Sequence, residues 1–100
     1  MRLYPVVPLN MRTATDDTIL PVGGGPSGSK PVLVRKGDVV LFSAWSMHRR
    51  KDLWGADADE FRPARWWEGF QPGAEYLPFN SGPRVCIGRK FSISSYQLLL

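Results

Sequence analysis

Prolines and glycines interrupt this chain at short intervals as far as Gly88. Nine prolines and ten glycines occur among its 100 residues. Proline removes a backbone donor and glycine weakens helices, so this spacing favours short strands and turns over long helices. No such breaker follows Gly88, and the apolar side chains up to Leu100 recur at roughly helical spacing. The sequence therefore predicts one good helix at the end of a chain of short elements.

The rest of the chain predicts an α+β fold class. Short strands are expected at residues 9–15, 18–20, 32–34 and 39–42, the last two forming a hairpin. Residues 21–31 predict a flexible loop, and residues 62–83 an extended meander. Residues 1–4 suggest the last turn of a helix, residues 43–50 a short helix or irregular stretch, and residues 57–61 a helical turn. Because an incomplete helix is expected at each end of the chain, the sequence predicts a piece of a longer domain.

Composition narrows the class of protein. With 43% hydrophobic and 12% aromatic residues the chain resembles a globular protein, and its net charge of +4 does not demand nucleic acid as a partner. No stretch approaches the roughly 18 apolar residues of a membrane span, and no signal peptide is visible. The single cysteine excludes an internal disulfide framework.

That cysteine, Cys86, lies just ahead of the predicted helix. Unpaired N–H groups at a helix start stabilise a thiolate, and Arg84 adds positive charge. Gly82 and Gly88 permit a close approach that a side chain would block. A lone cysteine is otherwise usually a buried, inert small hydrophobe, which is the alternative interpretation of Cys86.

The segment from Phe79 to Gly88 resembles the heme-binding signature of the cytochrome P450 superfamily. The signature is Phe, two residues, Gly, one residue, Arg, one residue, Cys, one residue, Gly, and its defining positions are filled by Phe79, Gly82, Arg84, Cys86 and Gly88. The resemblance implies that the Cys86 thiolate ligates the iron of heme b. It also implies that Arg84 meets a heme propionate and that Phe79 shields the sulfur.

Three further segments are similar to the family in the expected order. Phe61–Trp66 is similar to its Phe-x-Pro-Glu-Arg segment, with Ala64 in place of the usual Glu. Arg2 resembles the arginine of its Glu-x-x-Arg helix, and Arg12 falls where many members place an arginine that meets a propionate. The resemblance thus covers essentially the whole chain and implies that residues 1–100 are a C-terminal fragment of one P450 domain, mainly α as a whole.

The resemblance also implies a network in which Arg2 and Arg65 share a glutamate. That glutamate would lie three residues before Arg2, outside this chain. An unpaired buried charge costs several kcal/mol, so we expect Arg2 and Arg65 to be hydrated and the network to be loose.

The family resemblance implies a monooxygenase that inserts one oxygen atom of O₂ into an apolar substrate. Electrons would come from NADPH through a reductase, and the parent enzyme would be held at the endoplasmic reticulum membrane by an anchor absent here. The Gly-Gly-Gly-Pro loop, Met47–Gly55 and Tyr76–Asn80 resemble fungal alkane and fatty-acid hydroxylases. Without the oxygen-activating helix the fragment alone is expected to be inactive. The alternative is a non-catalytic heme-binding or interaction fragment.

The remaining chemically suggestive residues have structural interpretations. His48 is expected to be a packed or hydrogen-bonded residue, and the four tryptophans are expected to pack in a core rather than stack on nucleobases. The basic clusters Arg49–Lys51 and Arg84, Arg89, Lys90 are either solvated surface or a docking site for an acidic electron donor. A basic nucleic-acid-binding domain is the least favoured hypothesis.

Overall fold

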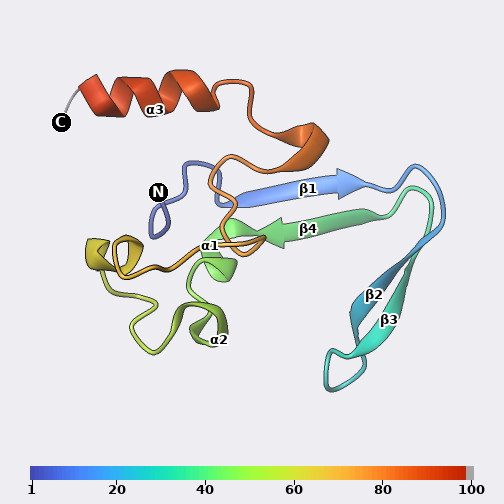
Figure 1. The fold of residues 1–100 in the computed structure, drawn as a ribbon. Helices are drawn as coiled ribbons and strands as arrows, with labels where there is room; N and C mark the ends of the chain where they lie inside the picture. Colours follow the sequence, from blue (N-terminus) through green and yellow to red (C-terminus); the bar gives the residue numbers. More distant parts are fainter. Residues whose placement is uncertain (99–100) are drawn as a thin grey trace. The chain divides into compact units, whose positions relative to one another are not determined.

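The computed structural model describes residues 1–98, except the side chain of Tyr96, and divides into two units (Figure 1). The strand unit is Leu9–Ser43, and the larger unit is formed by Met1–Pro8 together with Ala44 and the residues after it. The elements in chain order are β1 (Leu9–Thr13), β2 (Thr18–Gly24), β3 (Lys30–Val34), β4 (Val39–Ser43), α1 (Ala44–Met47), α2 (Lys51–Trp54), two 3₁₀ turns (Pro63–Trp66 and Gly82–Arg84) and α3 (Arg89–Leu98).

The strand unit contains two antiparallel ladders, β1 with β4 and β2 with β3. Leu9 pairs with Ser43 in the first ladder, and Thr18 pairs with Val34 in the second. The predicted hairpin between residues 32–34 and 39–42 is therefore wrong. The turn between them instead bonds to the end of β1, since the Gly37 N–H donates to the Ala14 carbonyl at 2.9 Å. The turn thus connects two ladders rather than closing one.

The flexible loop predicted at residues 21–31 is shorter than expected. β2 runs through Pro21 to Gly24, and β3 begins at Lys30. A two-stranded ladder has open edges where proline is tolerated. At Gly24 a Cβ would lie 2.9 Å from the Pro31 carbonyl oxygen, so this glycine permits close strand approach. Gly24 therefore serves the packing of two strands and not the flexibility of a loop.

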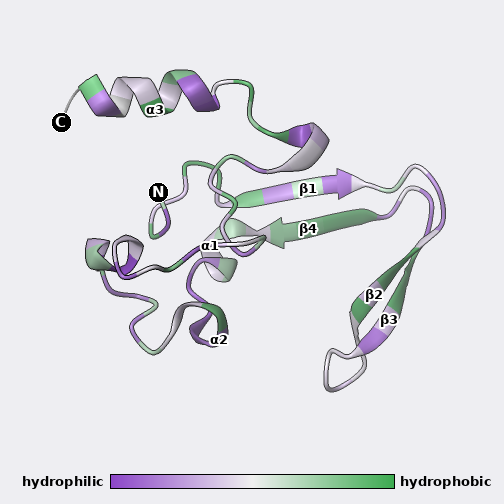
Figure 2. Cartoon of the chain, viewed as in Figure 1, coloured by the Kyte–Doolittle hydropathy of each residue, from purple (hydrophilic) through white to green (hydrophobic). Residues whose placement is uncertain are grey.

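The strands β2, β3 and β4 are largely hydrophobic in Figure 2, but many of their side chains are exposed in this structure. Val22, Leu33 and Leu41 belong to this exposed set, and Val34 is the buried exception. The interior of the larger unit is better formed. Its fully buried large side chains, among the residues the structure describes, are Trp54 and His48.

An aromatic cluster surrounds Trp54. Its ring centroid lies 5.0 Å from that of Phe70, 6.0 Å from Tyr76 and 6.3 Å from Trp66. The core packing expected for the tryptophans is therefore confirmed for Trp54. It is wrong for Trp67, whose side chain is 82% exposed.

The helix predictions have mixed outcomes. The helix expected after Gly88 is present as α3, and its predicted last two residues lie outside the described residues. Residues 1–4 form no helical turn, and Leu3 and Tyr4 are bends, while the buried Arg2 side chain bonds to the carbonyls of distant segments. The short α2 helix was not predicted. Within the described residues, no helix is long and apolar enough to cross a membrane.

Candidate functional site

The cysteine loop, Phe79–Gly88, is held by its own backbone. The Cys86 N–H donates to the Phe79 carbonyl at 2.8 Å, and the Val85 N–H donates to the Gly82 carbonyl at 3.1 Å. Pro83 lies at the start of the 3₁₀ turn inside the loop, where its missing N–H is not needed. These bonds hold the backbone of Phe79, the first residue of the signature, against the backbone of Cys86.

Two glycines of the signature have different geometries. Gly82 has φ of +59°, in the left-handed region that a glycine adopts without steric cost. At Gly88 a Cβ would lie 3.8 Å from Cys86 Sγ, so any longer side chain would extend beside the sulfur. Gly82 therefore serves the turn, and Gly88 leaves the space beside the thiol open.

Cys86 lies at the start of α3. The Arg89 N–H donates to the Cys86 carbonyl at 3.2 Å, and the Ser92 N–H donates to the Gly88 carbonyl at 2.9 Å. Cys86 therefore precedes the ten-residue helix α3 by three residues, in agreement with the sequence prediction that it lies just ahead of a helix. The Cys86 side chain is exposed, so the burial assumed in the alternative interpretation is wrong, and its role as a ligand stays a prediction.

The residues around Cys86 fit a heme. Val85, Ile87 and Phe91 are exposed apolar side chains, and Ile87 is fully exposed. An accessible soft thiol is a donor that suits iron, and exposed apolar neighbours suit the face of a macrocycle. Arg84 is exposed in the same loop. The donor set and its surroundings are therefore compatible with thiolate-ligated heme.

Phe79 is half-buried and lines a cavity of about 390 Å³ beside the cysteine loop. Its other lining residues within the described chain include Leu77, Asn80, Arg89 and Ile93. The cavity joins the segment that enters the loop to the first turns of α3.

Arg12, the second predicted propionate partner, belongs to the strand unit. It lies on β1 with an exposed side chain, and its guanidinium donates to the Met11 carbonyl at 2.7 Å. The guanidinium carbon is also 5.6 Å from the centroid of the Phe42 ring. Its role toward heme stays a prediction.

The expectation that Arg2 is hydrated is wrong. Arg2 is buried, and its guanidinium donates to the carbonyls of His48 (2.7 Å), Ala58 and Glu60 (3.0 Å). It also lies 5.0 Å from the centroid of the Trp54 ring. Backbone carbonyls thus take the place of the expected carboxylate, and burial and the nearby Arg65 lower the pKa of Arg2.

The same expectation is wrong for Arg65. Arg65 is buried, donates to the Trp54 carbonyl at 2.7 Å and forms an ion pair with Asp57 at 2.7 Å. Arg62 reaches the same carboxylate at 2.8 Å, and the two guanidinium groups lower the Asp57 pKa to about 2. The sequence interpretation missed Asp57, since nothing in its local context marks it as a partner of an arginine eight residues later.

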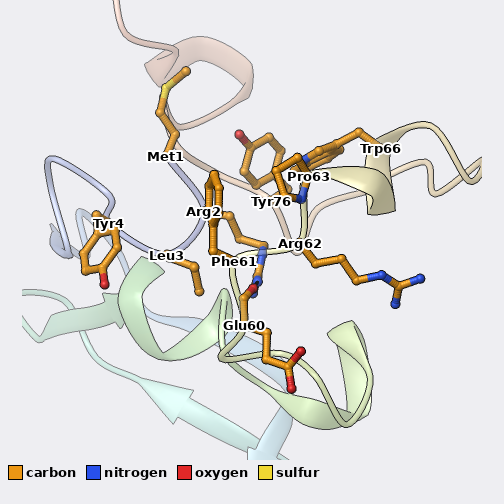
Figure 3. A pocket seen from close by; sticks show the side chains of 10 residues that line it. All are labelled: Met1, Arg2, Leu3, Tyr4, Glu60, Phe61, Arg62, Pro63, Trp66 and Tyr76. Carbon is orange, nitrogen blue, oxygen red and sulfur yellow. Dashed lines mark hydrogen bonds between the residues drawn. The ribbon is translucent and has the colours of Figure 1, made fainter.

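These segments enclose a second cavity of about 260 Å³, shown in Figure 3. Side chains from Met1–Tyr4 and Glu60–Pro63 line it together with Trp66 and Tyr76.

The Arg65 Nε atom is buried and has no hydrogen-bond partner among the residues described.

His48 is a structural residue, as expected. It is fully buried, its Nδ1 is 3.1 Å from the Arg2 carbonyl oxygen, and its Nε2 accepts a hydrogen bond from the Leu77 N–H at 3.0 Å.

The two basic clusters differ. In the first, Arg49 stacks on Trp45 with 3.4 Å between the guanidinium carbon and the ring centroid, and Arg50 pairs with Asp52. In the second, Arg84, Arg89 and Lys90 are exposed and form no ion pair with any residue that the structure describes.

Comparison with known proteins decides the family. The model of the family described as cytochrome P450 matches residues 1–100. The chain belongs to the cytochrome P450 family. It is 59% identical over 93 residues to cytochrome P450 monooxygenase g430 of a Fusarium species, covering 93% of this chain and 16% of that protein. It is 51% identical over 100 residues to cytochrome P450 52A13 of Debaryomyces hansenii, and 53% identical over 104 residues to cytochrome P450 52E1 of Candida apicola.

The P450 52A13 match covers 100% of this chain and 19% of that protein, and the P450 52E1 match covers 99% and 20%. The chain therefore spans about a fifth of the length of these relatives. The predicted membership of the P450 superfamily is confirmed, and heme is the cofactor that this family implies.

Proposed function

We propose that residues 1–100 are the heme-binding, C-terminal section of a single P450 domain, in which Cys86 is the iron ligand. The observation that carries this proposal is the exposed Cys86 thiol at the start of α3, in a loop closed by the bond from its N–H to the Phe79 carbonyl. The open space beside Gly88 leaves the sulfur accessible to a metal ion.

Each residue of the predicted site has a separate task in this proposal. Cys86 Sγ binds the metal, Phe79 packs beside it, and Gly82 and Gly88 shape the loop. Arg84 and Arg12 each offer a guanidinium to a propionate carboxylate, a pairing that favours two parallel hydrogen bonds. Heme b, when bound, would supply the activation of O₂ and the transfer of one oxygen atom to substrate, and the protein would position and tune it.

The parent protein is proposed to act on an apolar substrate such as an n-alkane or a fatty acid, at the endoplasmic reticulum membrane. Support comes from the three segments that resemble fungal hydroxylases, among them Met47–Gly55, which runs from α1 through α2. The exposed cluster of Arg84, Arg89 and Lys90 offers an acidic, NADPH-dependent reductase a docking surface close to the cysteine loop.

The buried Arg65 Nε supports the view that further parts of a P450 domain complete this one. A carboxylate there would satisfy an atom that has no partner among the described residues. The second candidate function is a non-catalytic heme-binding or interaction fragment of the same fold, which the same accessible thiol favours.

The test is to add heme to the chain, reduce it and add carbon monoxide. We expect the red-shifted absorption band of thiolate-ligated heme in the original sequence and its loss in Cys86→Ser. Because Cys86 is exposed, the circular dichroism of the heme-free chain should be the same for both proteins. Arg50→Ser is the matched control, because Arg50 is exposed and pairs with Asp52, and it should leave the band unchanged. An identical band in Cys86→Ser would refute the ligand assignment.

A further inference from the structure

The two ring nitrogens of His48 bond to backbone groups of two distant segments. A backbone N–H can only donate, so the Leu77 N–H requires Nε2 to be an acceptor without a proton. The proton of a neutral imidazole is then on Nδ1, which donates to the Arg2 carbonyl at 3.1 Å. The geometry therefore specifies one neutral tautomer of a fully buried ring.

Leu77 is close in sequence to the cysteine loop. Only Pro78, with its restricted φ, separates it from Phe79, whose carbonyl accepts the Cys86 N–H at 2.8 Å. Tyr76, on the other side of Leu77, packs on the imidazole with 5.4 Å between ring centroids. A continuous series of contacts thus runs from His48 through Leu77 and Phe79 to the backbone of Cys86.

We propose that His48 is a positioning residue for the cysteine loop, acting through its Nε2 bond to Leu77. By holding the entrance of the loop, it sets where the Phe79 carbonyl meets the Cys86 N–H. Its relevance to heme rests on the proposed function, whereas its effect on loop order is independent of any ligand.

The surroundings of the ring favour the neutral form. Burial is the largest cause that lowers the pKa of His48, and the charged groups near it, Arg2, Arg49 and the amino group of Met1, lower it further. The hydrogen bond to the Arg2 carbonyl opposes this shift. A protonated Nε2 would point a donor at the Leu77 donor. As the pH falls below the ordinary histidine pKa of 6.5, the folded state that keeps His48 neutral is progressively destabilised. The hydrogen bond from Leu77 to His48 Nε2 should therefore weaken as the pH falls.

Two amide substitutions separate the two bonds. Glutamine reaches the position of Nε2 and can accept from Leu77, whereas asparagine reaches only the position of Nδ1 and can bond to the Arg2 carbonyl. Amide hydrogen exchange in the heme-free chain is the measurement. We expect His48→Gln to keep the Leu77 and Cys86 amides protected, and His48→Asn to raise both exchange rates about tenfold. Unchanged Cys86 protection in a folded His48→Asn would overturn the proposal.

A measurement on the original chain guards against variants that do not fold. If His48 couples Leu77 to the cysteine loop, the hydrogen bonds of the Leu77 and Cys86 amides open together. Their exchange rates then show the same dependence on urea concentration below the global unfolding transition. Different dependences would overturn the proposal without any variant.

The heme spectrum separates this proposal from the proposed function. In chains loaded with heme and carbon monoxide, the thiolate band should persist in His48→Gln and be diminished in His48→Asn. If the original chain shows no thiolate band at all, the proposed function fails, and the exchange rates of Leu77 and Cys86 still decide whether His48 positions the loop.

Discussion

Within the larger unit, the interior around Trp54 and the cysteine loop are ordered in different ways. Around Trp54, aromatic rings and two buried guanidinium groups fill the space, and Arg2 alone bonds to three carbonyls. In the cysteine loop the side chains of Cys86 and Ile87 are exposed, and order comes from backbone hydrogen bonds. The interior is thus ordered by packed side chains, whereas the loop that carries the proposed ligand is ordered by backbone hydrogen bonds and leaves its side chains exposed.

The largest expected effect is in the interior. Trp54→Ala removes a fully buried side chain and should lower the free energy of unfolding by about 3–5 kcal/mol. Trp67→Ala is the matched control, since that side chain is 82% exposed, and should cost less than about 0.5 kcal/mol. Urea denaturation measures both. Equal losses in the two variants would contradict the difference between interior and surface.

A smaller change in the free energy of unfolding is expected when the pH is lowered. Asp57 has its pKa lowered from 3.8 to about 2 by Arg65 and Arg62, so its ion pairs stabilise the fold above pH 3.8 and this contribution is lost as the pH falls toward 2. Asp57→Asn should therefore be less stable than the original chain at pH 5, and the gap should close toward pH 2.

Denaturation curves at several pH values measure that gap. Asp59→Asn is the control, because Asp59 is exposed and lies 3.7 Å from Arg49. A gap between the original chain and Asp57→Asn that stays constant from pH 5 to 2 would show that these ion pairs do not stabilise the fold.

The smallest effect is expected in the cysteine loop. Gly82→Ala forces an alanine into φ of +59° and should cost about 1 kcal/mol. Gly88→Ala adds a Cβ at an ordinary 3.8 Å from Cys86 Sγ and should cost less. Urea denaturation and exchange of the Cys86 amide measure both. A larger loss in Gly88→Ala than in Gly82→Ala would show that space beside the sulfur, rather than the turn, limits the loop.

Local patterns predicted α3, four strand positions and the cysteine loop, because each depends on residues near one another in sequence. Breakers end at Gly88, and α3 begins at Arg89. Strand partners were mispredicted, since β3 could pair with either neighbour and short-range turn signals do not choose between them. The five signature positions of the cysteine loop predict the family, and the match over residues 1–100 confirms it.

The sequence by itself determined the family, the identity of the candidate ligand Cys86 and the position of the helix that follows it. Only the tertiary structure decided that Arg2 and Arg65 are buried, that Asp57 pairs with Arg65, and that His48 bonds to both Arg2 and Leu77. The physical reason is the range of the interactions. A helix start and a tight turn are encoded by adjacent residues, whereas a buried charge depends on which distant carbonyls and carboxylates the fold brings within hydrogen-bonding distance.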